Sequence, residues 1–337
     1  MDLICLNFIG VLEAEHSLIT NSIGVYPSRP HLFMKTLSWI KKDVSLKNYN
    51  TFRINGKTKY FTKVSSKDKL IKTLHWAKEN SLPVFILGNG SNILFPDKKY
   101  KGIVIKIENN KLKKINKQTI LVGAGMMLME LLQKGFEGLE WTNGIPATIG
   151  GAVFCNAGGF AYHFGNFVKK VRTIDLETCK ERIYSQKDCK FKYRESIFKK
   201  NKEVIWEVEL FIKRGNKAKI MEKSRNYWKY KYDAGIFKHP SAGSIFKNIF
   251  AKEMPHKYRK GATIKKGKIS VGWFIEKCNL KGKKCGGAMI SNFHANVIIN
   301  FKNAKTKDVL YLINFCKEKV YKKFKIKLKE EIIVIHY

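Results

Sequence analysis

Two glycine-rich segments contain the residue types that could hold a phosphate or a flat cofactor. The first, GNGSN at 88–92, directly follows the apolar residues 84–87, and the second is NGIPATIGGAVFCNAG at 143–158. Glycine lets a backbone approach a ligand closely, and successive N–H groups in a turn can surround phosphate oxygens. Taken alone, GNGSN is more typical of a plain tight turn, and the second segment is what favours an anion cradle.

The second segment has the composition of a buried structure rather than of a linker. Its apolar residues Ile145, Ile149 and Val153 are interleaved with glycines, whereas flexible linkers are polar and rich in serine. Small residues there leave room for a flat or phosphorylated group against the backbone. A dinucleotide-binding Rossmann loop is excluded, because Ile93 replaces the third glycine and 93–97 has the pattern of a strand followed by a turn.

Hydrophobic periodicity predicts the elements that position these segments. A helix is expected to start at Ser65–Asp68 and to end at Asn80, and a second helix over 308–324 is expected to have Thr306 as its cap. Strands are predicted at 84–87, 103–107, 120–125, 169–175, 204–212 and 332–336, and another helix at 126–132. Because helices and strands alternate without a strict βαβ rhythm, the pattern favours an α+β fold.

The formal charge of +38 raises the alternative of a nucleic-acid-binding protein. However, 57 of the 65 basic residues are lysines, and they are scattered through nearly every predicted element. Specific nucleic-acid recognition relies more on the bidentate guanidinium of arginine, and no zinc-finger, RNA-binding or basic-zipper motif is present. We therefore expect no nucleic-acid partner and attribute the charge to a general lysine bias.

The cysteines and the first residues bear on the compartment. Seven cysteines form no C-x-x-C pair, and no histidine stands at metal-ligand spacing, so we expect free thiols in a reducing cytoplasm and no metal. The apolar run Leu3–Leu12 is too short to span a bilayer, and no membrane anchor is expected. Residues 1–33 contain no lysine, so we expect Met34 to be the functional start and 1–33 to be a leader or extension, with a targeting peptide as the alternative.

Six motifs together carry a resemblance to a known family. They are NTFRI at 50–54, LGNGSNILF at 87–95, GLEWTNGIPATIGGAVFCNAG at 138–158, YRESIF at 193–198, SAGSIFKN at 241–248 and HAN at 294–296. In this order they resemble the UDP-N-acetylenolpyruvoylglucosamine reductase (MurB) family over residues 37–336. The sequence near SAGSIFKN has no obvious extra tyrosine loop, and in this respect it resembles the shorter type II members more than type I.

The resemblance implies an FAD-binding fold of the PCMH/vanillyl-alcohol-oxidase type with a separate C-terminal substrate domain. The domains expected from it are FAD-binding subdomain 1 at 34–97, FAD-binding subdomain 2 at 98–216 and the substrate-binding domain at 217–337. It implies that FAD and NADPH are cofactors, and that hydride passes from NADPH to FAD and then to the enolpyruvyl double bond of a UDP-sugar. The product would be UDP-N-acetylmuramate, a precursor in peptidoglycan synthesis, cell-wall biogenesis, cell shape and cell division.

The family motifs assign cofactor contacts residue by residue. GNGSN is implied to be the diphosphate cradle, and the second segment to line the flavin and its diphosphate. The residues implied to bind the cofactor are Arg53, Gly88, Asn89, Gly90, Ser91, Asn92, Gly144, Ile145, Pro146, Thr148, Gly150, Gly151 and Ala152. Ala147 and Cys155 stand where the family usually has glycine and methionine, so the flavin contact is expected to shift first at Ala147.

Three residues are implied to be catalytic. Hydride attack on the methylene carbon leaves charge on the neighbouring carbon and its carboxylate, which a cation must stabilise, and Arg194 matches that role. Ser244 matches the general acid that protonates this carbon. Glu331 matches the family's C-terminal carboxylate, although Glu330 is an alternative because LKEEI replaces LEPEV. The residues implied to bind substrate are Tyr193, Lys247, Asn248, His294 and Asn296.

Several alternatives are compatible with the sequence. Another FAD-dependent oxidoreductase of the same fold would share the two glycine segments but should lack Ser244 and Glu331 in this arrangement. The basic run Lys252–Lys268 is interpreted as a solvated insertion, with attraction of the UDP diphosphate as the alternative. A monomer is expected, an oligomer is the alternative, and no motif decides between NADPH and NADH.

Overall fold

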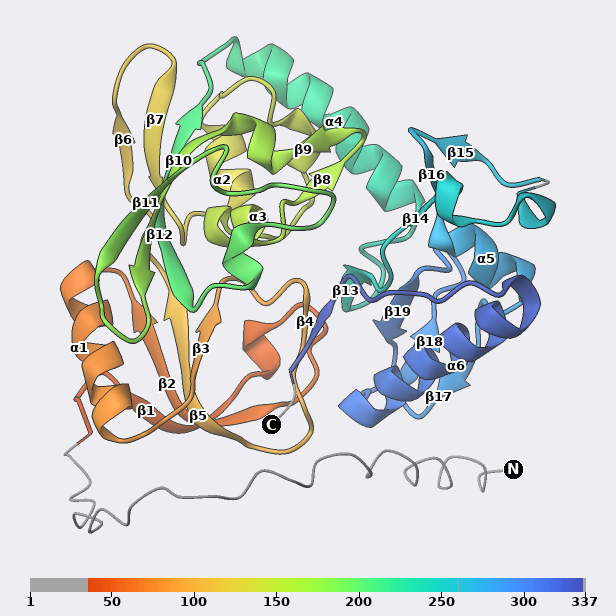
Figure 1. Cartoon of the computed structure of the whole chain (residues 1–337), viewed down its shortest axis with the longest axis horizontal. Helices are drawn as coiled ribbons and strands as arrows, with labels where there is room; N and C mark the ends of the chain where they lie inside the picture. Colours follow the sequence, from red (N-terminus) through yellow and green to blue (C-terminus); the bar gives the residue numbers. More distant parts are fainter. Residues whose placement is uncertain (1–35, 260, 336–337) are drawn as a thin grey trace, which may run out of the picture. The chain divides into compact units, whose positions relative to one another are not determined.

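The computed structural model describes residues 36–259 and 261–335 (Figure 1). Its first sheet has the strand order β1-β2-β5-β3, in which β2, β5 and β3 are parallel and β1 is antiparallel to β2. The strands are β1 (Lys41–Ser45), β2 (Lys57–Val64), β3 (Val84–Leu87) and β5 (Tyr100–Ile107). β3 ends directly before Gly88, so this sheet places the first glycine segment at the carboxyl end of a parallel strand.

Helix α1 (Lys67–Glu79) connects β2 to β3 and confirms the first predicted helix. Ser66 is its cap, because the Ser66 side chain accepts a hydrogen bond from the backbone N–H of Lys69. Leu70 and Leu74 are buried on the face that packs against the sheet, as the periodicity predicts.

The second sheet is antiparallel and has the order β11-β10-β12-β7-β6. Its strands are β6 (Leu112–Lys114), β7 (Thr119–Gly123), β10 (Val168–Asp175), β11 (Glu181–Ser185) and β12 (Glu203–Phe211). The helices associated with it are α2 (Leu128–Gln133), α3 (Ile149–Phe154) and α4 (Lys217–Asp233). The strands predicted at 120–125, 169–175 and 204–212 are thereby confirmed, and the helix predicted at 126–132 begins two residues later.

The third sheet has the order β13-β19-β18-β17. It consists of β13 (Ser241–Ser244), β17 (Lys284–Cys285), β18 (Ala288–Ile290) and β19 (Val297–Asn300), with helices α5 (Val271–Lys277) and α6 (Thr306–Phe324). The buried face of α6 contains Val309, Leu312, Ile313, Cys316 and Val320, which confirms the predicted apolar face.

The predicted cap of α6 is wrong by one residue. The residue before the helix is Lys305, and Thr306 is already helical. Asp97 accepts hydrogen bonds from the backbone N–H groups of Thr306 (2.8 Å) and Lys307 (3.0 Å). A carboxylate distant in sequence therefore satisfies the first helical N–H groups, which no local pattern could indicate.

The remaining strands are short. They are β4 (Ile93–Leu94), β8 (Gly158–Gly159), β9 (Tyr162–His163), β14 (Ile249–Phe250), β15 (Ile264–Lys265), β16 (Lys268–Ile269) and β20 (Ile333–Val334). β20 pairs in parallel with β4, which brings the end of the chain back to the first glycine segment. The strand predicted at 332–336 is shorter in the structure, and its residue 336 lies outside the described residues.

The basic run Lys252–Lys268 is folded rather than wholly solvated, so that interpretation is wrong in part. Met254 is 1% exposed within the C-terminal core. β15 and β16 form an antiparallel hairpin, and β16 pairs with β14. Figure 1 shows that β16 leads directly into α5.

Two large hydrophobic cores divide the described chain. One contains residues from Ile40 to Ile220 and serves the first two sheets together, whereas the other is built mainly from 242–332. Ile220 lies on α4, so this helix packs its buried face on the first core. We propose that the C-terminal domain begins after α4 rather than at 217, and that the two FAD-binding subdomains share one core.

The mixed content of helices and strands confirms the α+β class. Among residues 36–259 and 261–335, the structure has no helix that is both long and apolar enough to cross a membrane. The predictions for the leader 1–33 and for Met34 as the start fall outside the described residues.

Candidate active site

The first glycine segment presents open backbone donors. In the described part of the chain, the backbone N–H groups of Asn89, Gly90 and Ser91 make no hydrogen bond. Gly90 has a φ of +66°, and a Cβ at this position would collide with the backbone carbonyl of Tyr49. Only glycine fits at Gly90, and the neighbouring N–H groups are available to an anion.

The two glycine segments contact each other. The side-chain amide of Asn89 donates to the carbonyl oxygen of Pro146 over 2.8 Å. A Cβ at Gly88 would lie 2.7 Å from Oγ1 of Thr148. The ammonium group of Lys106 donates to the carbonyl of Gly88 over 3.0 Å, which places a cation beside the open N–H groups. The segments therefore form one cradle, and its chemistry fits a diphosphate.

Unpartnered polar atoms near the cradle also fit a bound cofactor. Oγ1 of Thr51 and Oδ1 of Asn143 are buried and have no hydrogen-bond partner among the described residues. Thr51 is next to the first segment, because its backbone N–H donates to the carbonyl of Gly90 over 3.2 Å. A buried polar atom is costly without a partner, and a cofactor with donors and acceptors would supply one.

The second segment offers fewer donors than its glycines suggest. Thr148 caps α3, and its Oγ1 accepts a hydrogen bond from the N–H of Gly151 over 3.2 Å. The N–H groups of Ile149 and Gly150 donate to the carbonyls of Met126 and Ala124. Because these groups are already bonded, the small residues 150–152 can offer shape to a cofactor but not first-turn N–H donors.

Two expected cofactor positions differ in their surroundings. Ala147 is buried, its N–H donates to the carbonyl of Ile145, and its carbonyl accepts from the N–H of Leu128. Because its φ is not positive, an alanine is unstrained at this position. Arg53 has a φ of +53° and is exposed. Among the described residues its side chain makes no hydrogen bond or ion pair, so its cofactor contact stays a prediction.

Arg194 lies at the tip of a tight turn. Lys192 and Glu195 exchange backbone hydrogen bonds of 3.0 and 3.1 Å, and Arg194 between them has a φ of +57°. The ammonium group of Lys199 donates to the carbonyl of Arg194 over 2.6 Å. A left-handed arginine is uncommon and persists only where its surroundings enforce it.

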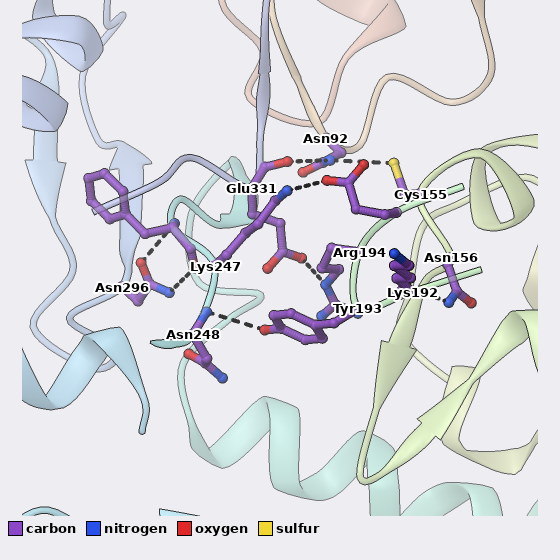
Figure 2. A network of polar contacts seen from close by, with 12 residues as sticks. Asn92, Cys155, Asn156, Lys192, Tyr193, Arg194, Lys247, Asn248, Asn296 and Glu331 are labelled. Carbon is purple, nitrogen blue, oxygen red and sulfur yellow. Dashed lines mark hydrogen bonds and ion pairs between the residues drawn. The ribbon is translucent and has the colours of Figure 1, made fainter. Parts of the chain in front are cut away.

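The turn directs Arg194 onto Glu331, as Figure 2 shows. Nε of Arg194 donates to Oε1 of Glu331 over 2.5 Å, and the two side chains are 18% and 15% exposed. Burial raises the pKa of the Glu331 carboxyl, while the Arg194 cation acts in the opposite direction. Glu330 instead pairs with Lys317 of α6. The structure thus directs Glu331, and not Glu330, toward Arg194.

The first glycine segment holds Glu331 in place. The side-chain amide of Asn92 donates to the carbonyl of Glu331 over 3.1 Å and contacts Sγ of Cys155 at 3.7 Å (Figure 2). The N–H of Glu331 donates to the carbonyl of Ile245 over 2.7 Å. Asn92 therefore joins the expected cofactor cradle to the expected catalytic carboxylate.

Ser244 ends strand β13 immediately before Ile245, so its backbone is anchored beside Glu331. Ser244 is half-buried, and its hydroxyl makes no hydrogen bond within residues 36–259 and 261–335. The hydroxyl is therefore free to bond a ligand. The contact between Ser244 and substrate stays a prediction.

Two residues implied to bind substrate have structural contacts here. Asn296 is buried, and its side chain bonds both the N–H and the carbonyl of Phe246, over 3.0 and 2.8 Å (Figure 2). Nδ1 of His294 accepts a hydrogen bond from the N–H of Asn296, and burial lowers the pKa of His294. Both residues shape the segment that follows Ser244.

The other three face the Arg194 turn. Nζ of Lys247 lies 2.5 Å from a carboxylate oxygen of Glu195, and the hydroxyl of Tyr193 accepts a hydrogen bond from the N–H of Asn248 over 3.2 Å (Figure 2). Oδ1 of Asn248 accepts from the N–H of Val271. YRES and SAGSIFKN are therefore brought together as the motifs imply.

The sequence does not identify two titratable side chains near this turn, Lys268 and His163. Nζ of Lys268 lies 3.6 Å from the ring centre of Tyr193. A Cβ at Gly158 would lie 2.7 Å from Nδ1 of His163 and 3.1 Å from a guanidinium nitrogen of Arg194. Burial, and then the positive charges of Lys268 and Arg194, lower the pKa of His163. The site has an excess of positive charge, which suits an anionic ligand.

Comparison with known families assigns the cradle and the cationic site to a class of protein. Residues 58–183 match the FAD binding domain. The protein is therefore an FAD-dependent oxidoreductase. Residues 235–335 match the C-terminal domain of UDP-N-acetylenolpyruvoylglucosamine reductase.

Curated relatives and a solved structure agree. The chain is 35% identical to the UDP-N-acetylenolpyruvoylglucosamine reductase of Prochlorococcus marinus subsp. pastoris over 90% of this chain and 99% of that protein. The corresponding protein of Borreliella burgdorferi is 33% identical over 92% and 99%. The crystal structure of the reductase (MurB) from Thermus caldophilus aligns with a TM-score of 0.69 and 29% identity, covering 87% of this chain and 98% of that one. The chain belongs to the UDP-N-acetylenolpyruvoylglucosamine reductase family.

Family membership confirms several of the predictions. The resemblance is confirmed, as are the FAD-binding α+β fold with a separate C-terminal domain and the use of FAD and NADPH. It favours the reductase over the two alternatives, another flavin oxidoreductase and a nucleic-acid-binding protein. The assignment to type II and the roles of individual residues stay predictions.

Proposed function

We propose that the protein reduces UDP-N-acetyl-enolpyruvoylglucosamine to UDP-N-acetylmuramate, as a cytoplasmic monomer that supplies peptidoglycan synthesis. When bound, FAD supplies the hydride chemistry, accepting hydride from NADPH and passing it to the enolpyruvyl double bond. The observation that carries the proposal is the Arg194–Glu331 pair, which three separate motifs bring beside Ser244. The family of the relatives supports the same reaction.

Arg194 supplies the positive charge. Hydride addition leaves negative charge on the substrate carbon and its carboxylate, and a fixed cation stabilises that charge most where water is excluded. Arg194 is mostly buried and is held by its turn, so it requires little reorganisation to meet the charge. Glu331 keeps the guanidinium oriented.

Ser244 supplies the proton at the carbon next to the carboxylate. Its hydroxyl makes no hydrogen bond within the described chain, so the proton is not committed to a protein acceptor. A serine hydroxyl is a weak acid, and protonation by it depends on exact placement. The backbone bonds that hold Ile245 to Glu331 and Asn296 provide that placement.

The cradle holds the cofactor. The open N–H groups of residues 89–91 bind the diphosphate, Lys106 adds a positive charge, and the turn around Gly144 borders the flavin. Asn92, Thr148 and Pro146 stabilise this cradle through hydrogen bonds to other protein groups rather than to the cofactor. Asn92 has a second role, because it positions Glu331.

The anionic part of the UDP-sugar binds beside the YRES turn. When the substrate binds, Lys247 leaves its ion pair with Glu195 and contacts the substrate instead. Tyr193 and Asn248 border the same space. Asn296 and His294 act as positioning residues because their polar groups already bond the protein.

Lys268 is expected to contribute to substrate affinity. Replacing Lys268 with methionine removes one of the cations near Tyr193, so the KM for the UDP-sugar should rise roughly tenfold, with kcat changed less than threefold. Lys265→Met is the control, since Lys265 is exposed on the same hairpin. Equal KM values for the two variants would remove Lys268 from the site.

The reaction is tested by steady-state consumption of NADPH together with mass analysis of the product. We expect NADPH consumption to depend on the enolpyruvyl UDP-sugar, with one equivalent of UDP-N-acetylmuramate formed per NADPH. Oxidation of NADPH at the same rate without the UDP-sugar would favour another flavin oxidoreductase of this fold. Substituting NADH in the same assay decides the nucleotide preference.

A further inference from the structure

Lys231 is a buried lysine that contacts the second glycine segment. It lies on α4, is 9% exposed, and donates hydrogen bonds to two backbone carbonyls. These belong to Trp141, at 2.9 Å, and to Asn143. Its stem also lies against Gly144, where a Cβ would be 3.5 Å from Cδ of Lys231. One side chain thus holds three positions at the start of the turn that borders the flavin.

The ammonium group has no carboxylate to balance its charge. Within the described residues Lys231 makes no ion pair, and its ammonium group also lies over the aromatic ring of Phe160, whose centre is 5.7 Å away. Titratable groups on the elements packed here include Glu140, Lys223, Tyr227 and Tyr162, and Glu140 pairs with Lys223 at 3.5 Å. Burial without a counter-charge lowers the pKa of Lys231 to about 8.

We propose that Lys231 is a positioning residue that fixes the turn 141–146 for FAD and makes the affinity for FAD depend on pH. The inference rests on the proposed place of the flavin beside this turn. Two features support it. The side-chain amide of Asn143 donates to the carbonyl and the hydroxyl of Ser224 on the same helix, over 3.2 and 3.1 Å, so α4 holds this turn at more than one point. The two carbonyls would also lose their charged donor if Lys231 were neutral.

The direction of the pH effect follows from the protonated form. An ammonium group bonds carbonyl oxygens more strongly than a neutral amine does, and its charge favours the anionic cofactor. FAD affinity should therefore be constant below about pH 8 and should fall as the pH rises above the pKa of Lys231. The pKa shift itself acts on folding in the opposite sense. A lysine with a lowered pKa in the folded state makes the fold more stable as the pH rises above about 8, so unfolding linked to Lys231 would not explain alkaline FAD release.

The test follows FAD release from the holoenzyme by the fluorescence of free flavin after dilution, between pH 7 and pH 10. In the unmodified protein the Kd for FAD should rise roughly tenfold between pH 7 and pH 9.5. Lys231→Met should show a raised Kd at pH 7 and no dependence on pH. Lys231→Arg should keep the low Kd up to pH 10, because arginine remains charged.

The control is Lys229→Met, which removes a largely exposed lysine of the same helix that pairs with Asp233. It should release FAD as the unmodified protein does. Circular dichroism at each pH shows whether a variant is folded. If Lys231→Met does not fold, Lys231→Arg still decides: alkaline release identical to that of the unmodified protein would overturn the proposal. Unchanged FAD release in a folded Lys231→Met would do the same. Turnover is not measured, so either outcome leaves the proposed reaction intact.

Discussion

Replacement of Ser244 by alanine is expected to leave reduction of the bound flavin by NADPH unchanged and to slow the substrate-dependent step by about 10²–10⁴-fold. The reason is that NADPH reduction requires no proton from this residue, whereas the second half-reaction ends on a carbon that must be protonated. The Ser244 hydroxyl has no hydrogen-bond acceptor within residues 36–259 and 261–335, so alanine removes no structural bond. Stopped-flow absorbance of the flavin separates the two half-reactions.

The control for this substitution is Ser241→Ala in the same strand. Oγ of Ser241 accepts a long hydrogen bond of 3.4 Å from the N–H of Gly243, so its loss should change both rates by less than about threefold. Recovery of flavin absorbance in Ser244→Ala at the rate of the unmodified protein would remove Ser244 from the mechanism.

Glu331→Gln is expected to lower kcat by roughly 10²–10³-fold while FAD stays bound. The substitution keeps the shape of the side chain but removes the negative charge that orients Arg194 over 2.5 Å. Because the pair is mostly buried, Arg194 would be left without its counter-charge and free to adopt other orientations. Steady-state turnover and the flavin absorbance of the purified variant measure the two effects.

Glu330→Gln is the matched control for this prediction. Glu330 is the adjacent carboxylate and pairs with Lys317 on the surface of α6, so its replacement should change turnover by less than about threefold. If Glu330→Gln blocked turnover and Glu331→Gln did not, the assignment of the catalytic carboxylate would be reversed.

Much of the fold could be predicted because local signals agree with the tertiary structure. Ser66 caps α1 as the sequence indicates, and the apolar stripe of α6 is buried as its period of 3.6 requires. Patterns of this kind depend only on neighbours within a few turns of chain. The start of α6 is not indicated by the local sequence, because its first N–H groups bond Asp97, which is far away in the sequence.

The candidate site was predicted only where motifs were contiguous. The glycine segments can be found by inspection and YRES only through the family resemblance, and the interpretation of Lys252–Lys268 as solvated misses the approach of Lys268 to Tyr193. The role of Lys231 could not be predicted either, because a lysine on a charged helix gives no sign that its ammonium group is buried. Such contacts depend on how distant segments pack, which hydrophobic periodicity does not encode.

The choice between Glu330 and Glu331 can be compared between the sequence pattern and the structure. Alternation along an extended segment predicts that adjacent side chains point to opposite sides, and alignment on Leu328 favours Glu331. The structure directs Glu331 to Arg194 and Glu330 to Lys317. Catalysis by Glu331 is still a prediction, which the paired substitutions test.

We propose that one bound flavin connects NADPH to the enolpyruvyl UDP-sugar at this site. The most direct measurement follows the visible absorbance of the flavin in the purified protein without oxygen. Addition of NADPH should bleach it, and only the subsequent addition of the enolpyruvyl UDP-sugar should restore it, with UDP-N-acetylmuramate formed in equal amount. Flavin that stays bleached after this substrate is added, or that recovers equally with UDP-N-acetylglucosamine, would contradict the account.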